Sequence, residues 1–198
     1  MAPLGPPAQG FLPALHPPPP TPPFAPGPAA AALLAWFATA QRDLPWRHTT
    51  DPYAIWLSEV VLQQTRIAQG RGYWERLLAR FPTVQALAGA PEAALLKAWE
   101  GLGYYSRARN LQRAAQAIVA NHGGALPASL PALEALPGIG PYTARAIGAF
   151  AFGLRAAVLD GNVLRVLARL HASPMPIDAP AARRHYQPLA DAWLAPAP

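Results

Sequence analysis

The sequence predicts an all-α protein, and three observations support this class. From Ala29 onward, apolar residues recur at helical spacing in one segment after another. Proline or glycine separates these segments, as expected of residues that end helices. No run alternates β-branched and polar residues in the way that a strand requires. With 52% hydrophobic and 13% charged residues, the 198-residue chain has the composition of a protein that folds around a sizeable core.

The N-terminal segment has a different composition from the rest of the chain. Residues 1–28 contain 12 of the 26 prolines and no Asp, Glu, Lys or Arg. Such a segment favours polyproline II and cannot build a packed core. We therefore expect a disordered tail; a ligand for a proline-recognising partner is the alternative.

Ten helices are expected after this tail. In chain order they cover residues 29–41, 53–68, 70–80, 83–88, 91–99, 105–121, 129–136, 141–152, 162–171 and 178–194. The residues that separate them are Pro45, Pro52, Pro82, Pro91, Gly101 with Gly103, Gly123 with Gly124, and Pro137 with Gly138. The chain shows no internal repeat.

The charge balance favours a polyanionic partner. The net charge is +6 and the pI about 10.3, which is typical of proteins that bind nucleic acid. Lys97 is the only lysine, so arginine supplies the other basic residues. GC-rich coding explains this arginine bias equally well, and the charge alone therefore leaves the partner open.

The absence of cysteine restricts the chemistry. A chain without cysteine has no disulfide, no thiolate metal site and no iron–sulfur cluster bound by its own thiolates. The N-terminus lacks the basic region of a signal peptide, and the apolar run that begins at Ala29 is too short to span a bilayer. We expect a cytoplasmic protein that does not contact membranes.

The segment LPGIGPYTA, Leu136–Ala144, joins two of the predicted helices at a tight corner. Pro141 suits the first turn of a helix, where its missing N–H costs nothing. Gly138 and Gly140 allow positive φ and leave the backbone uncovered, so that amide groups can converge on an anion such as a DNA phosphate. An ordinary corner with glycine at a helix end is the alternative.

Two acidic residues lie in apolar surroundings. Glu59 is in the middle of a predicted helix, with Ile55, Trp56 and Leu62 as helical neighbours. Poor solvation raises the pKa of a carboxyl group, which then remains protonated near neutral pH and can act as a general acid. Asp160 precedes another helix, where a capping role alone would explain it. As a pair, one protonated and one ionised carboxyl group suit the hydrolysis of a glycosidic bond.

Several strings together resemble a known family, the adenine DNA glycosylases of the MutY type, within the helix–hairpin–helix DNA glycosylase superfamily. These strings are LPWR, DPYAIWLSEVVLQQT, YWERLLARFPTVQALAGAP, WEGLGYYSRARNLQRAA, LPGIGPYTA and LDGNVLRVLARL, between Leu44 and Leu170. The resemblance implies a six-helix domain with the helix–hairpin–helix over residues 44–153. It also implies a second helical domain, built from residues 29–43 and 154–198.

The resemblance implies a role for individual residues. Glu59 resembles the general acid that protonates adenine, and Asp160 the carboxylate that stabilises the oxocarbenium ion. Asn162 and Tyr142 resemble supporting hydrogen-bond partners. The residues expected to contact the base pocket or DNA are Arg42, Gln63, Gln64, Tyr104, Gly138, Gly140 and Thr143. Among these, Gln64 and Tyr104 resemble residues that enter the base stack when adenine is flipped out.

The implied substrate is double-stranded DNA with adenine opposite 8-oxoguanine or guanine, bound by a monomer in the bacterial cytoplasm. Related enzymes with lyase activity have a lysine where this chain has Tyr142, so we expect a monofunctional hydrolase. In the family, four cysteines bind a [4Fe-4S] cluster, and these ligands are absent from the chain. The chain thus resembles a truncated enzyme, for which we expect weak activity or none.

Other residues and other functions remain open. Trp46, Trp56 and Trp99 are expected in the core, whereas Arg107 and Arg109 suit either phosphate contacts or a solvated helix face. A helix–hairpin–helix module that binds DNA without chemistry is the main alternative. A lyase similar to endonuclease III is a weaker one.

Overall fold

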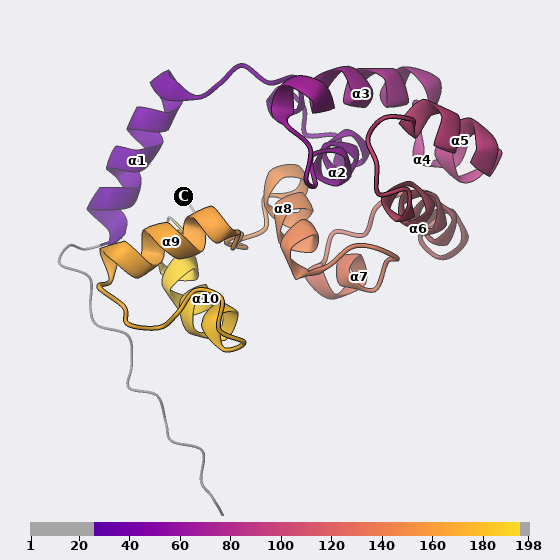
Figure 1. Cartoon of the computed structure of the whole chain (residues 1–198). Coiled ribbons are helices and arrows are strands. Elements are labelled where there is room, and N and C mark those ends of the chain that lie inside the picture. Colours follow the sequence, from indigo (N-terminus) through magenta and orange to yellow (C-terminus); the bar gives the residue numbers. More distant parts are fainter. Residues whose placement is uncertain (1–25, 195–198) are drawn as a thin grey trace, which may run out of the picture.

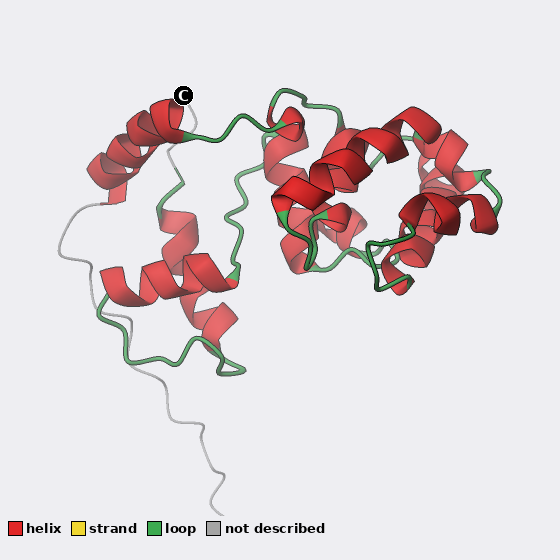
Figure 2. Cartoon of the chain, turned by 45° about the horizontal axis from the view of Figure 1, so that its top comes forward, coloured by secondary structure: helices red, strands yellow, loops and turns green. Residues whose placement is uncertain are grey.

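The computed structural model describes residues 26–194, and within this range the protein is all-helical, as predicted. The helices are α1 (Pro26–Ala40), the 3₁₀ helix η1 (Pro45–Arg47), α2 (Pro52–Val61), α3 (Ile67–Arg80), α4 (Val84–Ala88), α5 (Glu92–Trp99), α6 (Ser106–His122), α7 (Leu130–Glu134), α8 (Pro141–Phe152), α9 (Gly161–Leu170) and α10 (Ala182–Ala192). No strand occurs in the described residues (Figure 2).

The helices form two lobes with separate hydrophobic cores (Figure 1). The larger lobe contains α2–α8, and the smaller lobe contains α9 and α10. A connector without regular structure, residues 153–160, leads from α8 to α9. At the other end of the chain, α1 lies apart from the larger lobe and close to α9 (Figure 1).

Helix α2 lies at the centre of the larger lobe because it packs against both α3 and α8. Its residues Tyr53–Ser58 are all buried, and Trp56 and Trp99 are among the largest enclosed side chains. The indole of Trp74 donates a hydrogen bond to the carbonyl oxygen of Ala54 at 2.8 Å. The predicted core positions of Trp56 and Trp99 are confirmed, and Trp46 packs at the edge of the same core.

Several helix boundaries differ from the sequence-based expectation. Helix α2 ends at Val61 instead of residue 68, and α3 begins at Ile67 instead of residue 70. Gly70 is buried, and a Cβ atom there would lie 2.7 Å from Cδ2 of Leu62, so close packing explains the glycine. Residues Pro26–Pro28 belong to the first turn of α1, which tolerates proline, instead of the predicted tail. The tail's other residues lie outside the described range.

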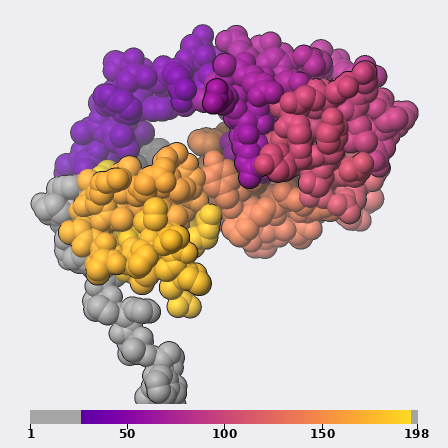
Figure 3. Space-filling model, viewed as in Figure 1, coloured from indigo at the N-terminus to yellow at the C-terminus, as the bar shows by residue number. Residues whose placement is uncertain are grey.

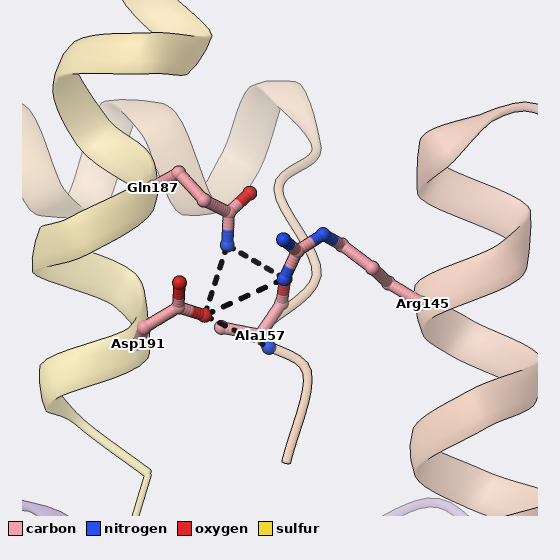
Figure 4. A network of polar contacts seen from close by, with 4 residues as sticks. All are labelled: Arg145, Ala157, Gln187 and Asp191. Carbon is pink, nitrogen blue, oxygen red and sulfur yellow. Dashed lines mark hydrogen bonds and ion pairs between the residues drawn. The ribbon is translucent and has the colours of Figure 1, made fainter. Parts of the chain in front are cut away.

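A polar network joins the two lobes (Figure 4). Arg145 of α8 reaches the carbonyl oxygen of Ala157 at 3.3 Å and a carboxylate oxygen of Asp191 of α10 at 3.5 Å. The amide of Gln187 donates to the same two acceptors, each at 3.0 Å. The connector is therefore held from both sides, by Arg145 of α8 and by Gln187 and Asp191 of α10.

An apolar pocket of about 530 Å³ separates α1 from the smaller lobe. It is lined by Ala29 and Leu33 of α1 and by apolar residues of α9 and α10, and Figure 3 shows the hollow between α1 and α9. Trp36 of α1 is 59% exposed. None of the helices in the described part of the chain is long and apolar enough to cross a membrane.

Candidate active site

The predicted helix–hairpin–helix consists of α7, residues 135–140 and α8. Gly138 has a φ of +75°, and a Cβ atom there would lie 2.6 Å from Cβ of Asn110 on α6. Glycine is thus required both by the backbone conformation and by the close approach of α6. Gly140 differs, because its φ is −90° and a Cβ atom would meet nothing within 4 Å.

The start of α8 leaves backbone amides available. Gly140 is the N-cap, no side chain caps the helix, and Pro141 occupies the first turn. The first N–H groups of a helix have no partner within the helix and carry the positive end of its dipole. An anion can therefore approach the exposed residues Gly140–Tyr142. The side chain of Thr143 is buried, with 3% of it exposed, and the DNA contact expected of this residue stays a prediction.

Glu59 is partly buried on α2, among the apolar residues that its helical position predicts. Burial raises the pKa of its carboxyl group to about 7, which agrees with the sequence-based argument. A substantial fraction of Glu59 is therefore protonated at neutral pH. A carboxyl group in this state donates a proton, which is the requirement for a general acid.

Asp160 caps α9, at the end of the connector between the lobes. Its Oδ1 accepts hydrogen bonds from the backbone N–H groups of Asn162 (2.8 Å) and Val163 (2.7 Å). Its Oδ2 accepts one from the side-chain amide of Asn162 at 3.0 Å. Three N–H donors suit an ionised carboxylate, which can only accept. Capping and a catalytic role are thus compatible, because the same donors fix the carboxylate in position.

Tyr142 connects the two acids electrostatically. The pKa of its phenol is raised to about 12, first by burial and then by the negative charges of Glu59 and Asp160. Charges act this way only over short distances, so one phenol that responds to both carboxyl groups indicates that all three groups share one site. The site combines α2 and α8 of the larger lobe with the start of α9. Tyr142 is 36% exposed, and a ligand can reach it.

A second cluster lies where α2 ends and α6 begins. Gln63, Gln64 and Tyr104 line an open pocket of about 440 Å³ together with Ser106 and Arg107. Gln64 and Tyr104 have φ values of +56° and +47°. This conformation costs a residue other than glycine roughly 1–2 kcal/mol, so the surroundings must impose it. Tyr104 is also 65% exposed, unusual for a large aromatic side chain.

Two other predicted positions differ in their surroundings. Arg42 is exposed in the segment between α1 and η1, and none of the contacts described for this part of the chain joins its side chain to Glu59 or Asp160. Arg109 pairs with Glu92 at 2.9 Å on the surface of the larger lobe, which supports the reading as a solvated helix face.

The role of Arg107 could not be derived from the sequence. Its guanidinium group points into the protein and donates to backbone carbonyl oxygens of two loops, so that neither reading, phosphate contact or solvated face, is correct. A single arginine in the first turn of a predicted helix does not indicate that its side chain will turn inward and bind backbone carbonyl groups. The glycines before it, Gly101 and Gly103, indicate a loop but not the side chain that holds it.

The residues present do not fit an iron–sulfur cluster. Such clusters are bound by cysteine thiolates, and the sequence contains no cysteine. Within residues 26–194 there is also no group of three or more His, Asp or Glu side chains arranged to hold a metal ion.

An all-helical fold with a glycine hairpin between α7 and α8 is the arrangement expected of a helix–hairpin–helix protein. Residues 57–189 match the family model described as HhH-GPD superfamily base excision DNA repair protein. The chain belongs to this superfamily.

Comparison with individual proteins narrows the relationship. The human adenine DNA glycosylase is 44% identical over 150 residues, which are 71% of this chain and 28% of that protein. The adenine DNA glycosylase of Mycobacterium tuberculosis (strain H37Rv) is 44% identical over 138 residues, 69% of this chain and 45% of that protein. The predicted resemblance to adenine DNA glycosylases is thus confirmed, although the chain spans less than half the length of either relative.

Solved structures agree with the fold. A thermostable thymine-DNA glycosylase aligns with a TM-score of 0.78 at 26% identity, covering 86% of this chain and 79% of that one. A non-covalent endonuclease III–DNA complex aligns with a TM-score of 0.65 at 21% identity, covering 83% and 80%. At that identity, the second likeness shows the fold alone.

Proposed function

We propose that the chain carries the catalytic site of a monofunctional adenine DNA glycosylase, which hydrolyses the N-glycosidic bond of adenine opposite 8-oxoguanine or guanine. The single observation that supports this most is the convergence of Glu59 and Asp160, from different lobes, on Tyr142. Sequence identity to adenine DNA glycosylases supports the choice of base.

The proposed reaction begins with a proton transfer from Glu59 to N7 of a flipped adenine. The protonated base is a better leaving group, so the C1′–N9 bond breaks and its electron pair stays with the base. The sugar becomes an oxocarbenium ion, which the carboxylate of Asp160 stabilises from the position fixed by its three N–H donors. A water molecule adds to C1′ and loses a proton, which leaves an abasic site and free adenine.

The hairpin and the wedge residues, Gln64 and Tyr104, bind the DNA around this reaction. Amides of Gly140 and the following turn of α8 contact a phosphate and fix the position of the duplex without reading its sequence. The glycosidic bond is inaccessible in an intact stack, so the adenine must leave it. Tyr104 is exposed enough to fill the vacated space.

We expect hydrolysis without a lyase step, because no lysine amine lies beside the two acids. Lys97 is the only lysine in the sequence, and it lies on α5, where it pairs with Glu100 at 2.5 Å. The position beside the two acids is occupied by Tyr142, which cannot form a Schiff base. We therefore expect no covalent complex after treatment with borohydride.

A single-turnover assay tests the proposal. With protein in excess over a duplex containing A opposite 8-oxoguanine, alkali cleaves each abasic site formed. Because single turnover detects even weak activity, wild type is expected to give product and Glu59→Gln to give none. Duplex binding without product from wild type would instead support a DNA-binding module. Borohydride trapping of wild type would support a lyase.

A further inference from the structure

Arg107 of α6 is directed into the protein although the chain as a whole is basic. Its Nη1 donates to the carbonyl oxygens of Val60 at 3.1 Å and Val61 at 3.3 Å, and also to that of Gln63. These carbonyls lie at the C-terminal end of α2, where a cation is favoured by the helix dipole.

The other terminal nitrogen of Arg107 reaches a different loop. Its Nη2 donates to the carbonyl oxygens of Leu102 at 3.0 Å and Gly103 at 3.3 Å. The guanidinium also lies 5.3 Å from the ring centre of Trp99 and 5.7 Å from that of Tyr104. One planar group thus joins two loops that are about 40 residues apart in the sequence, as the separations of its contacts show.

Each of these loops continues directly into a wedge residue. Gln64 follows Gln63, whose carbonyl oxygen is bound, and Tyr104 follows Gly103, whose carbonyl oxygen is bound as well. Both wedge residues have the positive φ that side chains disfavour. Conformations of this kind persist only where the surroundings impose them, and Arg107 supplies the contacts on the preceding residue in both cases.

We propose that Arg107 is a positioning residue that presets Gln64 and Tyr104 for insertion into the DNA stack at the mismatch. This inference rests on the proposed function, since it gives Arg107 a role in the base flipping that the proposed reaction requires. Arg107 does not touch the substrate. It acts by keeping two loops at a fixed spacing before DNA arrives, so that ordering them costs little on binding.

Lysine is the informative substitution. It keeps the charge and most of the stem, but its three donors radiate from one nitrogen and cannot bind carbonyls of both loops as the guanidinium fork does. Arg109 of the same helix provides the matched control, because its side chain is exposed and pairs only with Glu92 in the described contacts.

The test compares two substrates and one fluorescence signal in wild type, Arg107→Lys, Arg107→Met and Arg109→Met. In the first substrate the adenine is stacked opposite 8-oxoguanine. In the second it is bulged out and needs no wedge. The fluorescence signal is that of 2-aminopurine placed at the target position, which rises when the base leaves the stack.

For Arg107→Lys we expect release of stacked adenine to slow by about tenfold or more, a change of about 1.4 kcal/mol in the barrier. Release from the bulge should change little, and the 2-aminopurine signal at saturating protein should fall. Arg109→Met should match wild type in the stacked-to-bulged ratio. Because both substrates are assayed on one preparation, the ratio does not depend on the folded fraction. If Arg107→Met does not fold, the comparison of Arg107→Lys with wild type is sufficient for the test.

An equal loss on both substrates with a normal 2-aminopurine signal would overturn the inference, since it would indicate a general effect on folding or chemistry. An unchanged ratio would overturn it as well. If wild type released no adenine from either substrate, the proposed function would fail. The 2-aminopurine comparison would still decide the role of Arg107, because that signal requires binding and not bond cleavage.

Discussion

The carboxylate of Asp191 accepts a hydrogen bond from the backbone N–H of Ala157 at 3.3 Å. Asp191 lies in the last turn of α10, and Ala157 lies in the connector, three residues before Asp160. The carbonyl oxygen of Leu159, the residue before Asp160, is bound by Arg183 of α10 at 3.0 Å. Helix α10 therefore holds the connector at two points and determines where Asp160, the proposed catalytic carboxylate, meets the larger lobe.

Asp191→Ala is expected to reduce stability by about 1–2 kcal/mol, because the N–H of Ala157 and the guanidinium of Arg145 lose an acceptor. Urea denaturation measures this change. Glu75→Ala, which removes an exposed ion pair with Arg71, is the control and should cost less than about 0.5 kcal/mol. Equal effects of the two substitutions would contradict the importance assigned to the connector.

The rate of adenine release should depend on pH through Glu59. Its pKa is raised to about 7 by burial, so the general acid is protonated below this pH and is lost above it. Single-turnover rates are expected to fall by about tenfold per pH unit well above pH 7. A rate that stays constant from about pH 6 to about pH 9 would exclude Glu59 as the general acid.

The same raised pKa makes stability depend on pH. Below its ordinary pKa of 4.5, Glu59 is protonated in the folded and unfolded states, and its full contribution is present. As the pH rises to about 7, the unfolded state ionises first and this contribution is lost, by roughly 3 kcal/mol in total. Glu59→Gln cannot ionise. Urea denaturation should therefore show its stability relative to wild type increasing from pH 4.5 to above pH 7.

Two substitutions of Asp160 should separate its effect on stability as a helix cap from the effect of its negative charge on adenine release. Asp160→Ala removes the N-cap of α9 and is expected to cost about 1 kcal/mol in stability. Asp160→Asn keeps an acceptor for the backbone N–H groups and should cost little, yet both variants should lose adenine release because the negative charge is absent. Thermal denaturation and single-turnover kinetics, measured side by side, test this. Activity retained in Asp160→Asn would speak against charge stabilisation of the sugar.

The two hairpin glycines should respond differently to alanine. Gly138→Ala is expected to lose roughly 2 kcal/mol in stability, because φ is +75° and the new Cβ would lie 2.6 Å from Asn110. Gly140→Ala meets no atom within 4 Å and has an ordinary φ, so it should fold normally. Its added methyl group should instead weaken DNA binding, measured by fluorescence anisotropy. If the Gly140→Ala variant bound DNA with unchanged affinity, the proposed contact between the hairpin and a phosphate would be contradicted.

Features set by local sequence could be predicted. The apolar neighbours of Glu59 sit three and four residues away on one helix, so its poor solvation follows from spacing alone. The hairpin follows in the same way from glycine and proline at adjacent positions. Both depend on contacts within a few residues.

Features set by distant contacts could not be predicted. The predicted boundary at residues 68–70 is wrong, because α2 ends at Val61 and α3 begins at Ile67, with Leu62 packed against Gly70. Thr143 looked available at a helix start, yet the fold buries it. Arg107 depends on carbonyls 44–47 residues earlier in the chain, and no periodicity encodes that pairing.

The inward orientation of arginine has a consequence for how the protein moves on DNA. Arg107, Arg145 and Arg183 all donate to backbone carbonyl oxygens within the fold. These three guanidinium groups are therefore not available to displace counterions from phosphates, although they are among the 16 basic residues of the chain. Affinity should fall with ionic strength less steeply than the number of basic residues suggests, since each neutralised phosphate contributes a slope of about −0.9. Under the proposed function, undamaged duplex would then be held weakly, which favours rapid sliding and hopping between target sites.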